Sequence, residues 1–559
     1  MAASPQKSGE QATYYQQVGA ERSRAKLISA GSWALIVVML LAVFYFQGRL
    51  NHERAKRSLT YMEPLENAPP MLAFTSVALG GFRGMISTAL WFRLNEMQLE
   101  DKFFEMMQLA EWITQLQPHI PGVWTFQAWN LGYNISVKYE DNRDRWQWVY
   151  RGICLLRDEG LKYNPNEPTI YHELAWHFEH KMGAQLDNAH RLYKREWYLM
   201  WDKLLTMEKD DQGVIRTDFD RLTNPASAED TRRAQEVKLV YKMDPGKMAE
   251  VDARYGPLDW RMPETHSLYW AYLGIQLCEN NPTRAHLVRK LRRRVYNSMA
   301  YAVRRGRPVY KIIVAENEDG KEIEQELFDF GPNLDLFIAA NQTYLEQIGR
   351  KQEMYEAAKT IAEKAKAANQ DQNALEAERD MEHAKSDYAS FQHAHRNWLR
   401  EVFTHLFVNN RENEARAILK GIIKYYPEYA GAYMATEDGK VNMDKLALER
   451  VAEYSTKGGR DKVLIMIKGL MNKYYYHLAI GEEDDAIKYR SSAVKVYNLY
   501  RKRTENAEGD RVKIPTYRDI TAVVRVEMLQ EWKTKHEAIY LRLLSVLGED
   551  APPETDGTN

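Results

Sequence analysis

The chain has 559 residues and a formal net charge of −1, from 77 lysines and arginines against 78 aspartates and glutamates. Its length suits about two to four domains or one extended repeat array. The balanced charge lacks the basic excess typical of nucleic-acid-binding proteins, so we expect no nucleic-acid partner. The two cysteines, Cys154 and Cys278, are too few and too far apart for a disulfide framework or a CxxC zinc pair.

Residues 27–46 predict a transmembrane helix that follows a polar tail at 1–26. The segment, LISAGSWALIVVMLLAVFYF, contains no charged residue. At about 1.5 Å per residue, a helix of this length spans a hydrocarbon core of about 30 Å. A cleavable signal peptide would have a shorter apolar region followed by small residues at a cleavage site, whereas Gln47, Gly48 and Arg49 follow here. We therefore expect an uncleaved, single-pass anchor.

Basic residues flank this segment on both sides: Arg22, Arg24 and Lys26 before it, and Arg49, Arg54, Lys56 and Arg57 after it. The positive-inside bias therefore almost cancels. Because long domains translocate largely regardless of flanking charge, we expect the short tail to stay inside and the body to lie on the periplasmic side of a bacterial membrane. Residues 47–70 form a basic linker that ends in two prolines.

Residues 71–206 have helical apolar spacing and an internal repeat. The segment PGVWTFQAWNL, which begins at Pro121, aligns with PTIYHELAWHF, which begins at Pro168, at an offset of 47 residues. The same offset pairs Trp146 with Tyr193 in the segments that follow. Proline suits the first turn of a helix, because its missing N–H has no intrahelical acceptor there. The pattern predicts a repeated helical hairpin.

Later segments resemble the tetratricopeptide repeat (TPR) superfamily. Within 263–306, Trp270, Leu273 and Gly274 match the first half of that repeat. Within 398–548, the second half is matched by Ala415, Leu419, Ile422 and Pro427, and a further unit by Gly481 and Ala486. The resemblance covers about half of the chain, and the 47-residue unit exceeds the usual TPR length of about 34. It implies an all-α, TPR-like α-solenoid whose concave groove binds protein partners.

Three stretches interrupt the helical pattern. Residues 207–262 form a mixed polar insertion. Two alternating runs in 307–333 predict a small β-hairpin, the only strand pair that we expect. Residues 334–397 are rich in alanine, glutamate, lysine and glutamine, which favours long charged helices. A disordered tail is expected at 549–559.

The sharpest candidate for chemistry lies in the second 47-residue unit. His172 and Glu173 open an HExxxH sequence that ends at His177, and His180 follows three residues later. At about 100° per residue, His172 and His177 lie about 140° apart on a regular helix and do not face one metal ion. Glu173, His177 and His180 instead share one stripe, where a carboxylate and two imidazoles could bind a divalent metal.

This sequence is similar to the HExxxH of the dipeptidyl-peptidase III family of zinc exopeptidases, although the downstream glutamate motif of that family is not evident. The alternative is a polar helix face that contacts water or the next repeat. The equivalent positions in the first unit are Phe126, Asn130 and Tyr133, so the set is not part of the repeat pattern. On balance we expect no bound metal or other cofactor.

A second candidate is the loop Tyr255-Gly-Pro-Leu-Asp-Trp-Arg261 in the insertion. Gly-Pro sets a turn, and Asp259, Trp260 and Arg261 place a charge pair around an indole. One interpretation is a recognition loop on the groove, with Tyr255 at its start. The other is a loop that packs against the solenoid, since long loops are commonly either functional or structurally packed.

Basic and aromatic residues mark two further surfaces. Arg284, Arg289, Lys290 and Arg292–Arg294 form a patch that could contact an anionic lipid or an acidic partner, although a charged helix face is the ordinary explanation. The 14 tryptophans and 34 tyrosines include many at helical spacings, which is typical of helix packing and also of an aromatic groove for a peptide or a glycan.

These features predict a non-enzymatic, membrane-anchored scaffold that binds protein partners in a bacterial envelope or transporter-associated complex. Two alternatives remain open: a metal-dependent hydrolase that uses the HELAWHFEH segment, and a glycan-binding envelope protein. The sequence contains no P-loop, Rossmann or GxSxG motif, which favours the scaffold.

Overall fold

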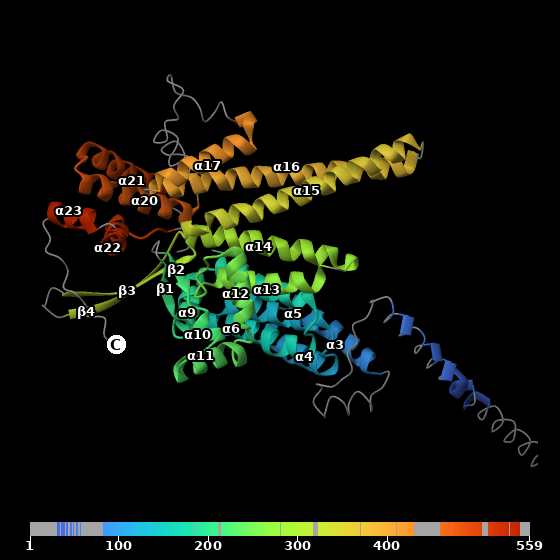
Figure 1. Cartoon of the computed structure of the whole chain (residues 1–559). Helices are drawn as coiled ribbons and strands as arrows, with labels where there is room; N and C mark the ends of the chain where they lie inside the picture. Colours follow the sequence, from blue (N-terminus) through green and yellow to red (C-terminus); the bar gives the residue numbers. More distant parts are fainter. Residues whose placement is uncertain are drawn as a thin grey trace, which may run out of the picture. The chain divides into compact units, whose positions relative to one another are not determined.

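The computed structural model describes residues 82–547, with gaps at 185, 211–213, 280, 317–321, 369–370, 410, 430–458, 506–512 and 536, and scattered residues between 31 and 56 (Figure 1). By its internal contacts the chain divides into two units, Met1–Gly80 and Gly81–Asn559. Helices account for most of the described residues, beside two antiparallel strand pairs. The all-α class is therefore confirmed.

The predicted anchor at 27–46 lies in the first unit and is described only in part. Its described residues are helical and exposed. The remainder of the segment, the tail at 1–26, most of the linker at 47–70 and the C-terminal tail at 549–559 lie outside the described residues. Among the residues that the structure describes, no helix is both long and apolar enough to cross a membrane. The anchor stays a prediction from the sequence.

The second unit opens with two paired helices, α3 (Phe82–Leu99) and α4 (Phe103–Leu116). Their facing sides form a small apolar core with the helix that follows. Its members include Leu94, Met106, Ile113, Val123 and Leu131. Burial of these side chains fixes α3 and α4 beside the repeated segment.

The two 47-residue segments form matching helical pairs. The first consists of α5 (Pro121–Trp129), the π-helical turn η1 (Asn130–Ile135), the 3₁₀ turn η2 (Ser136–Lys138) and α6 (Asn142–Cys154). A π-helical turn η3 (Leu155–Gly160) and α7 (Leu161–Tyr163) lead to the second, which consists of α8 (Pro168–Trp176), η4 (His177–Gly183) and α9 (His190–Asp202). Both α5 and α8 begin with proline, and both continue into a π-helical turn.

The insertion contains a strand pair that the sequence analysis missed. Strands β1 (Met207–Lys209) and β2 (Ile215–Thr217) pair antiparallel, so the expectation of a single hairpin in the chain was wrong. Strands of three residues are too short to show an alternating pattern. The helices α10 (Asp220–Thr223), α11 (Ala228–Leu239) and α12 (Pro245–Tyr255) follow. The side chains of Ser227 and Asp244 cap α11 and α12 by accepting backbone N–H groups.

Helices α13 (Pro263–Cys278) and α14 (Ala285–Arg305), joined through the 3₁₀ turn η5 (Pro282–Arg284), pack against α8. Gly274 permits this close approach: a Cβ atom there would lie 2.9 Å from Leu291 Cδ2 and 3.0 Å from Tyr171 Cβ. Ser267 Oγ, also on α13, donates a 2.9 Å hydrogen bond to the carbonyl oxygen of Ala175. Small residues thus lie where the three helices meet.

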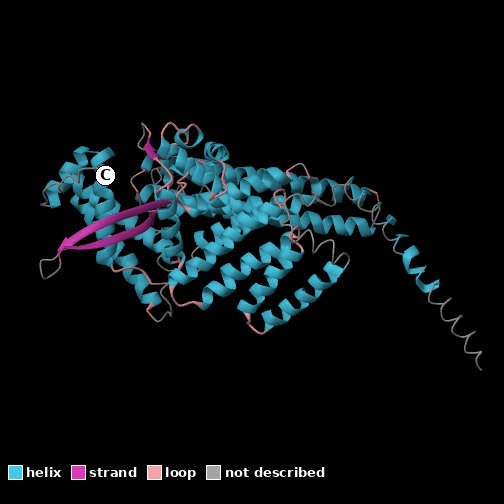
Figure 2. Cartoon of the chain, turned by 90° about the horizontal axis from the view of Figure 1, so that it is seen from below, coloured by secondary structure: helices cyan, strands magenta, loops and turns pink. Residues whose placement is uncertain are grey.

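A long β-hairpin and a long helical pair follow. Strands β3 (Arg307–Glu316) and β4 (Glu322–Gly331) pair in the register Arg307 opposite Gly331 and Glu316 opposite Glu322 (Figure 2). After the 3₁₀ turn η6 (Leu334–Leu336), helices α15 (Phe337–Ala367) and α16 (Asp371–Val408) pack along each other (Figure 1).

The last helices are α17 (Glu412–Tyr425), α20 (Arg460–Ile480), α21 (Glu483–Thr504), α22 (Tyr517–Lys535) and α23 (Glu537–Leu547), with the 3₁₀ turn η7 (Pro427–Tyr429) after α17. The residues that resemble TPR positions lie on their inner faces: Ala415, Leu419, Ile422 and Ala486 are buried. Gly481 ends α20 with a φ of 83°, a left-handed conformation that favours glycine.

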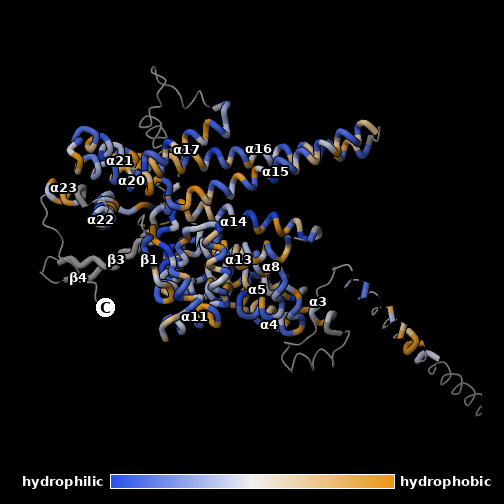
Figure 3. Tube along the Cα trace, viewed as in Figure 1, coloured by the Kyte–Doolittle hydropathy of each residue, from blue (hydrophilic) through white to orange (hydrophobic). Residues whose placement is uncertain are grey.

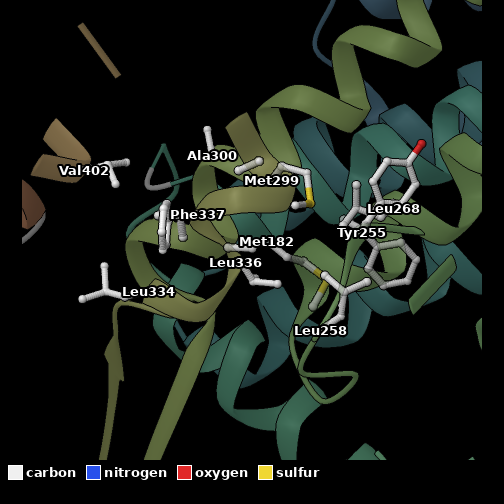
Figure 4. Close-up of a cluster of buried hydrophobic side chains, with 14 of the residues drawn as sticks. Met182, Tyr255, Leu258, Leu268, Met299, Ala300, Leu334, Leu336, Phe337 and Val402 are labelled. Atoms are coloured by element: carbon white, nitrogen blue, oxygen red, sulfur yellow. The ribbon is translucent and has the colours of Figure 1, made fainter. Parts of the chain in front are cut away.

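One apolar core runs through most of the second unit, from Trp124 in α5 to Leu544 in α23. Its largest fully buried side chains include Trp197, Trp201 and Trp260. Figure 4 shows one part of it, where η4, α13, α14 and the start of α15 meet. In Figure 3 apolar and polar positions alternate along most helices, as expected where one face packs and the other meets water.

Candidate recognition surface

The HExxxH residues lie across the junction between α8 and η4. His172 and Glu173 belong to α8, whereas His177 and His180 belong to the π-helical turn η4. His177 is fully buried. Its Nδ1 lies 2.9 Å from the carbonyl oxygen of Glu173, and its Nε2 lies 3.3 Å from that of Ala128. Each ring nitrogen therefore faces a backbone carbonyl oxygen, so whichever nitrogen carries the proton, the other has no open space in front of it for a metal ion.

His180 is also engaged. Its ring stacks on Trp176 with a centroid distance of 4.1 Å, and its Nδ1 lies 3.0 Å from the hydroxyl of Tyr133. Burial, with the charges of Arg294, Lys181 and His177, lowers the pKa of His180 to about 4. Burial raises the pKa of the Tyr133 hydroxyl. Both groups are therefore neutral at pH 7, and the Tyr133 hydroxyl donates to Nδ1.

The two remaining members of the motif face α14. Burial, with the charges of Arg294 and Lys290, lowers the pKa of His172 to about 4. Burial raises the pKa of Glu173, against the opposing charges of His177, Arg294 and Lys290. The Glu173 carboxylate lies 3.7 Å from Nδ1 of His177. The motif is thus embedded between helices, and its polar groups interact with residues of the protein.

A different group gathers possible metal ligands. Among the described residues, one ligand atom each from His477, Glu482 and Asp485 lies within 4.8 Å of the others, at the turn between α20 and α21. Nδ1 of His477 is 2.7 Å from a Glu482 oxygen, and Lys488 lies 3.8 Å from Asp485. No motif in the sequence marks this group, because it is the left-handed Gly481 that brings His477 and Glu482 together at the turn.

Glu179, which lies between His177 and His180 in η4, contributes to a buried contact with α14. It forms an ion pair with Arg294 and accepts a hydrogen bond from Asn297 at 3.1 Å. The Arg294 guanidinium lies over the ring of Trp176, 4.5 Å from its centroid. No local pattern in the sequence predicts this pair, since 115 residues separate its two members.

These contacts create a continuous row of rings that we call the aromatic ladder: Trp129, Tyr133, His180 and Trp176, capped by Arg294. Trp129 stacks on Tyr133 at 6.0 Å between ring centroids, and Tyr133 lies 5.7 Å from His180. Trp129 and Trp176 are equivalent positions of the two 47-residue segments, and so are Tyr133 and His180. Trp129 remains 36% exposed. The repeat therefore places matched aromatic side chains on one partly exposed surface.

The loop Tyr255–Arg261 packs inward. Tyr255, Asp259 and Trp260 are buried. Trp260 Nε1 donates to Asp252 at 3.0 Å. Arg261 pairs with Asp259 and with Asp202 of α9, each at 2.8 Å. This geometry is that of a loop packed against the helices, because these side chains are buried or form hydrogen bonds and ion pairs with other residues of the protein.

A buried ion network outside the motifs also escaped the sequence analysis. Lys194 Nζ lies 2.8 Å from Glu264 Oε1, and both side chains are fully buried. Arg305 donates to Asp461 at 2.6 Å and to the carbonyl oxygen of Gly183. Burial, with the charge of Arg305, lowers the pKa of Lys194 to about 8. The network connects α9, α13, α14 and α20.

Comparison with protein-family models and with curated proteins finds no match to this chain. The TPR resemblance accordingly rests on the residue spacing and on the paired helices described above.

Proposed function

We propose that the protein is a non-enzymatic, membrane-anchored, TPR-like scaffold that binds a protein partner through the aromatic ladder. The observation that carries the proposal is the ladder itself, in which equivalent residues of two helical pairs form one partly exposed surface. The apolar segment 27–46 supports the anchor, and the tendency of long domains to translocate regardless of flanking charge favours a body on the periplasmic side of a bacterial envelope. Consecutive packed helices with small residues at their crossings support the solenoid.

The ladder has the physical properties of a protein-binding surface. Aromatic side chains supply a large contact area and lose little conformational entropy when they are buried. Stacking and the Arg294 contact hold the rings in place before a partner binds, which reduces the ordering cost of association. The unburied part of Trp129 provides apolar area that a partner would cover.

The hydrolase alternative has less support. A catalytic metal needs imidazole lone pairs directed at one point. Instead, Nδ1 of His180 accepts from Tyr133, and both ring nitrogens of His177 face backbone carbonyl oxygens. Metal analysis of the purified protein, with a His177→Ala control, tests this alternative: tightly bound zinc that the variant loses would revive it.

Site-specific crosslinking in intact cells tests the proposal. The photoreactive p-benzoylphenylalanine replaces Trp129 in one variant and, as a control, Ile487 on α21, which is 60% exposed. We expect a discrete protein adduct from position 129 only. The protein identified by mass spectrometry is then purified and titrated against the full chain. Adducts of equal yield at both positions, or none at either, would contradict the proposal. A separate titration tests the glycan-binding alternative: saturable quenching of tryptophan fluorescence by a defined glycan would favour it.

A further inference from the structure

We propose that the partner binds as an acidic segment, a carboxylate-rich peptide that also carries an aromatic residue. This inference rests on the protein-binding function proposed above and adds the chemistry of the partner. Its evidence is a row of three cations on α14, Arg289, Lys290 and Arg293, which we call the cationic stripe. All three side chains are exposed. Their spacing places them on one side of the helix.

None of the three cations of the cationic stripe forms an ion pair in the part of the chain that the structure describes, although Glu173 and Glu179 lie near enough for the charges of Lys290 and Arg293 to act on them. The other four cations of α14 all have a carboxylate partner: Arg292 with Glu279, Arg294 with Glu179, Arg304 with Glu401, and Arg305 with Asp461. Arg289, Lys290 and Arg293 make no ion pair there. The unpaired charge is therefore concentrated on one face of a helix whose other cations are neutralised.

Groups beside the cationic stripe experience an excess of positive charge, from Lys290 and from other nearby cations. The pKa of His172 falls because of its burial and because of the nearby charges of Arg294 and Lys290. The pKa of Arg292 also falls, because of burial and because Arg350 of α15 lies close to it. A bound carboxylate would offset these like-charge interactions, and the stripe therefore favours an anionic ligand.

The cationic stripe continues directly from the aromatic ladder. Arg293 precedes Arg294, which caps the ladder over Trp176, and Lys290 lies one helical turn before Arg294. A short extended or helical peptide can therefore place carboxylates on the stripe and an aromatic ring beside the ladder. Figure 3 shows the hydrophilic stretch of α14 that carries the stripe.

A peptide fits this surface better than a lipid headgroup layer does. Stable attachment to anionic lipid by charge usually needs a cluster of about four to eight basic residues. Among the described residues the cationic stripe itself supplies three cations, and the carboxylates of Glu173 and Glu279 lie among the neighbouring side chains. Those carboxylates would repel a uniformly anionic surface, whereas a peptide can present its charges at selected positions.

Polymer binding to the full chain in zwitterionic nanodiscs tests the inference. The probes are fluorescent poly-L-glutamate and a glutamate–tyrosine copolymer, measured by anisotropy at low and at high salt. One variant combines Arg289→Ala, Lys290→Ala and Arg293→Ala. The matched control combines Lys495→Ala, Arg501→Ala and Lys502→Ala, which removes three exposed cations of α21.

We expect the stripe variant to weaken binding of the copolymer about tenfold at low salt, because three screened ion pairs are lost, and the control to change it less than about twofold. The copolymer should bind more tightly than poly-L-glutamate, and Trp129→Ala should abolish that difference. Equal losses in both triple variants, or no preference for the copolymer, would overturn the inference. So would stripe-dependent binding to phosphatidylglycerol vesicles without binding to either polymer.

The two proposals fail in distinguishable ways. If crosslinking at position 129 identifies a partner whose affinity the stripe variant leaves unchanged, the acidic-segment inference is wrong and the scaffold proposal stands. If no partner is crosslinked at the ladder, the scaffold proposal itself fails, whatever the polymers do.

Discussion

Replacing Lys194 with methionine should sharply destabilise the helices around it. In the native protein Lys194 and Glu264 form a fully buried ion pair at 2.8 Å. The variant leaves the Glu264 carboxylate buried, and the nearest remaining cation is Arg305, whose Nε is 3.9 Å from Glu264 Oε1. Loss of one partner of a buried pair costs about 3–5 kcal/mol. We expect the lower end of that range, because Arg305 compensates in part.

Hydrogen exchange is the appropriate assay, because a chain of this size need not unfold in one step. A loss of about 3 kcal/mol corresponds to exchange roughly 150 times faster in peptides from α9 and α13. The double variant Lys194→Met/Glu264→Leu should recover most of the protection, since no unpaired charge is left buried. As a control, Arg232→Met breaks exposed ion pairs with Glu229 and Glu236 and should leave the exchange rates nearly unchanged, because exposed ion pairs contribute little to stability. The reasoning is refuted if Lys194→Met changes exchange no more than this control, or if the double variant is no better protected than the single.

Three further predictions concern acid stability, close packing and the anchor. Burial lowers the pKa of His266 to about 3, so the folded state binds fewer protons than the unfolded state once the pH falls below about 6.5. The free energy of unfolding should therefore decrease as the pH falls from about 6.5 toward 3, and His266 should account for a loss of about 2 kcal/mol at pH 5. Thermal unfolding of the native protein and of His266→Leu at pH 7.5 and at pH 5 measures this loss. An identical pH dependence in the two proteins would contradict it. Gly274→Ala should destabilise the protein by about 1–3 kcal/mol, because the added Cβ clashes with Leu291 and Tyr171. The control Gly349→Ala should be neutral or stabilising, since a Cβ there has no atom within 4 Å. Equal denaturant midpoints for the two variants would contradict this prediction. Deletion of residues 27–46 should move the protein from the alkali-resistant membrane fraction to the supernatant, and continued sedimentation with membranes would show that another segment holds it there.

Local signals made the repeated segments predictable. Pro121 and Pro168 mark the first turns of α5 and α8, and apolar spacing marks their buried faces. The strands β3 and β4 follow from their alternating sequence. The π-helical turns have no such signature, and η4 changed the geometry expected for Glu173, His177 and His180. The predicted alignment of Glu173, His177 and His180 on one helix face required a regular α-helix, but from His177 onward the helix is π-helical and each turn is wider.

Contacts between distant residues could not be derived from spacing. Glu179 meets Arg294 across 115 residues, and Lys194 meets Glu264 across 70. In the sequence each of these four charged residues is typical of a solvated surface. Their burial becomes apparent only from the packing of α8, α9, α13 and α14. The aromatic ladder lies between these cases: its repeated tryptophans are visible in the sequence, whereas the stacking that joins them to Arg294 is not.

The affinity of the crosslinked partner for Trp129→Ala tests the central claim most directly. Truncation of an aromatic residue at the centre of an interface commonly weakens binding by about 2 kcal/mol or more, roughly 30-fold. The matched control is Phe92→Ala on α3, which removes an aromatic ring that is 69% exposed and lies outside the aromatic ladder. A scaffold that uses the aromatic ladder predicts a dissociation constant at least tenfold higher for Trp129→Ala and an unchanged one for Phe92→Ala. Equal dissociation constants for the native protein and Trp129→Ala would contradict it.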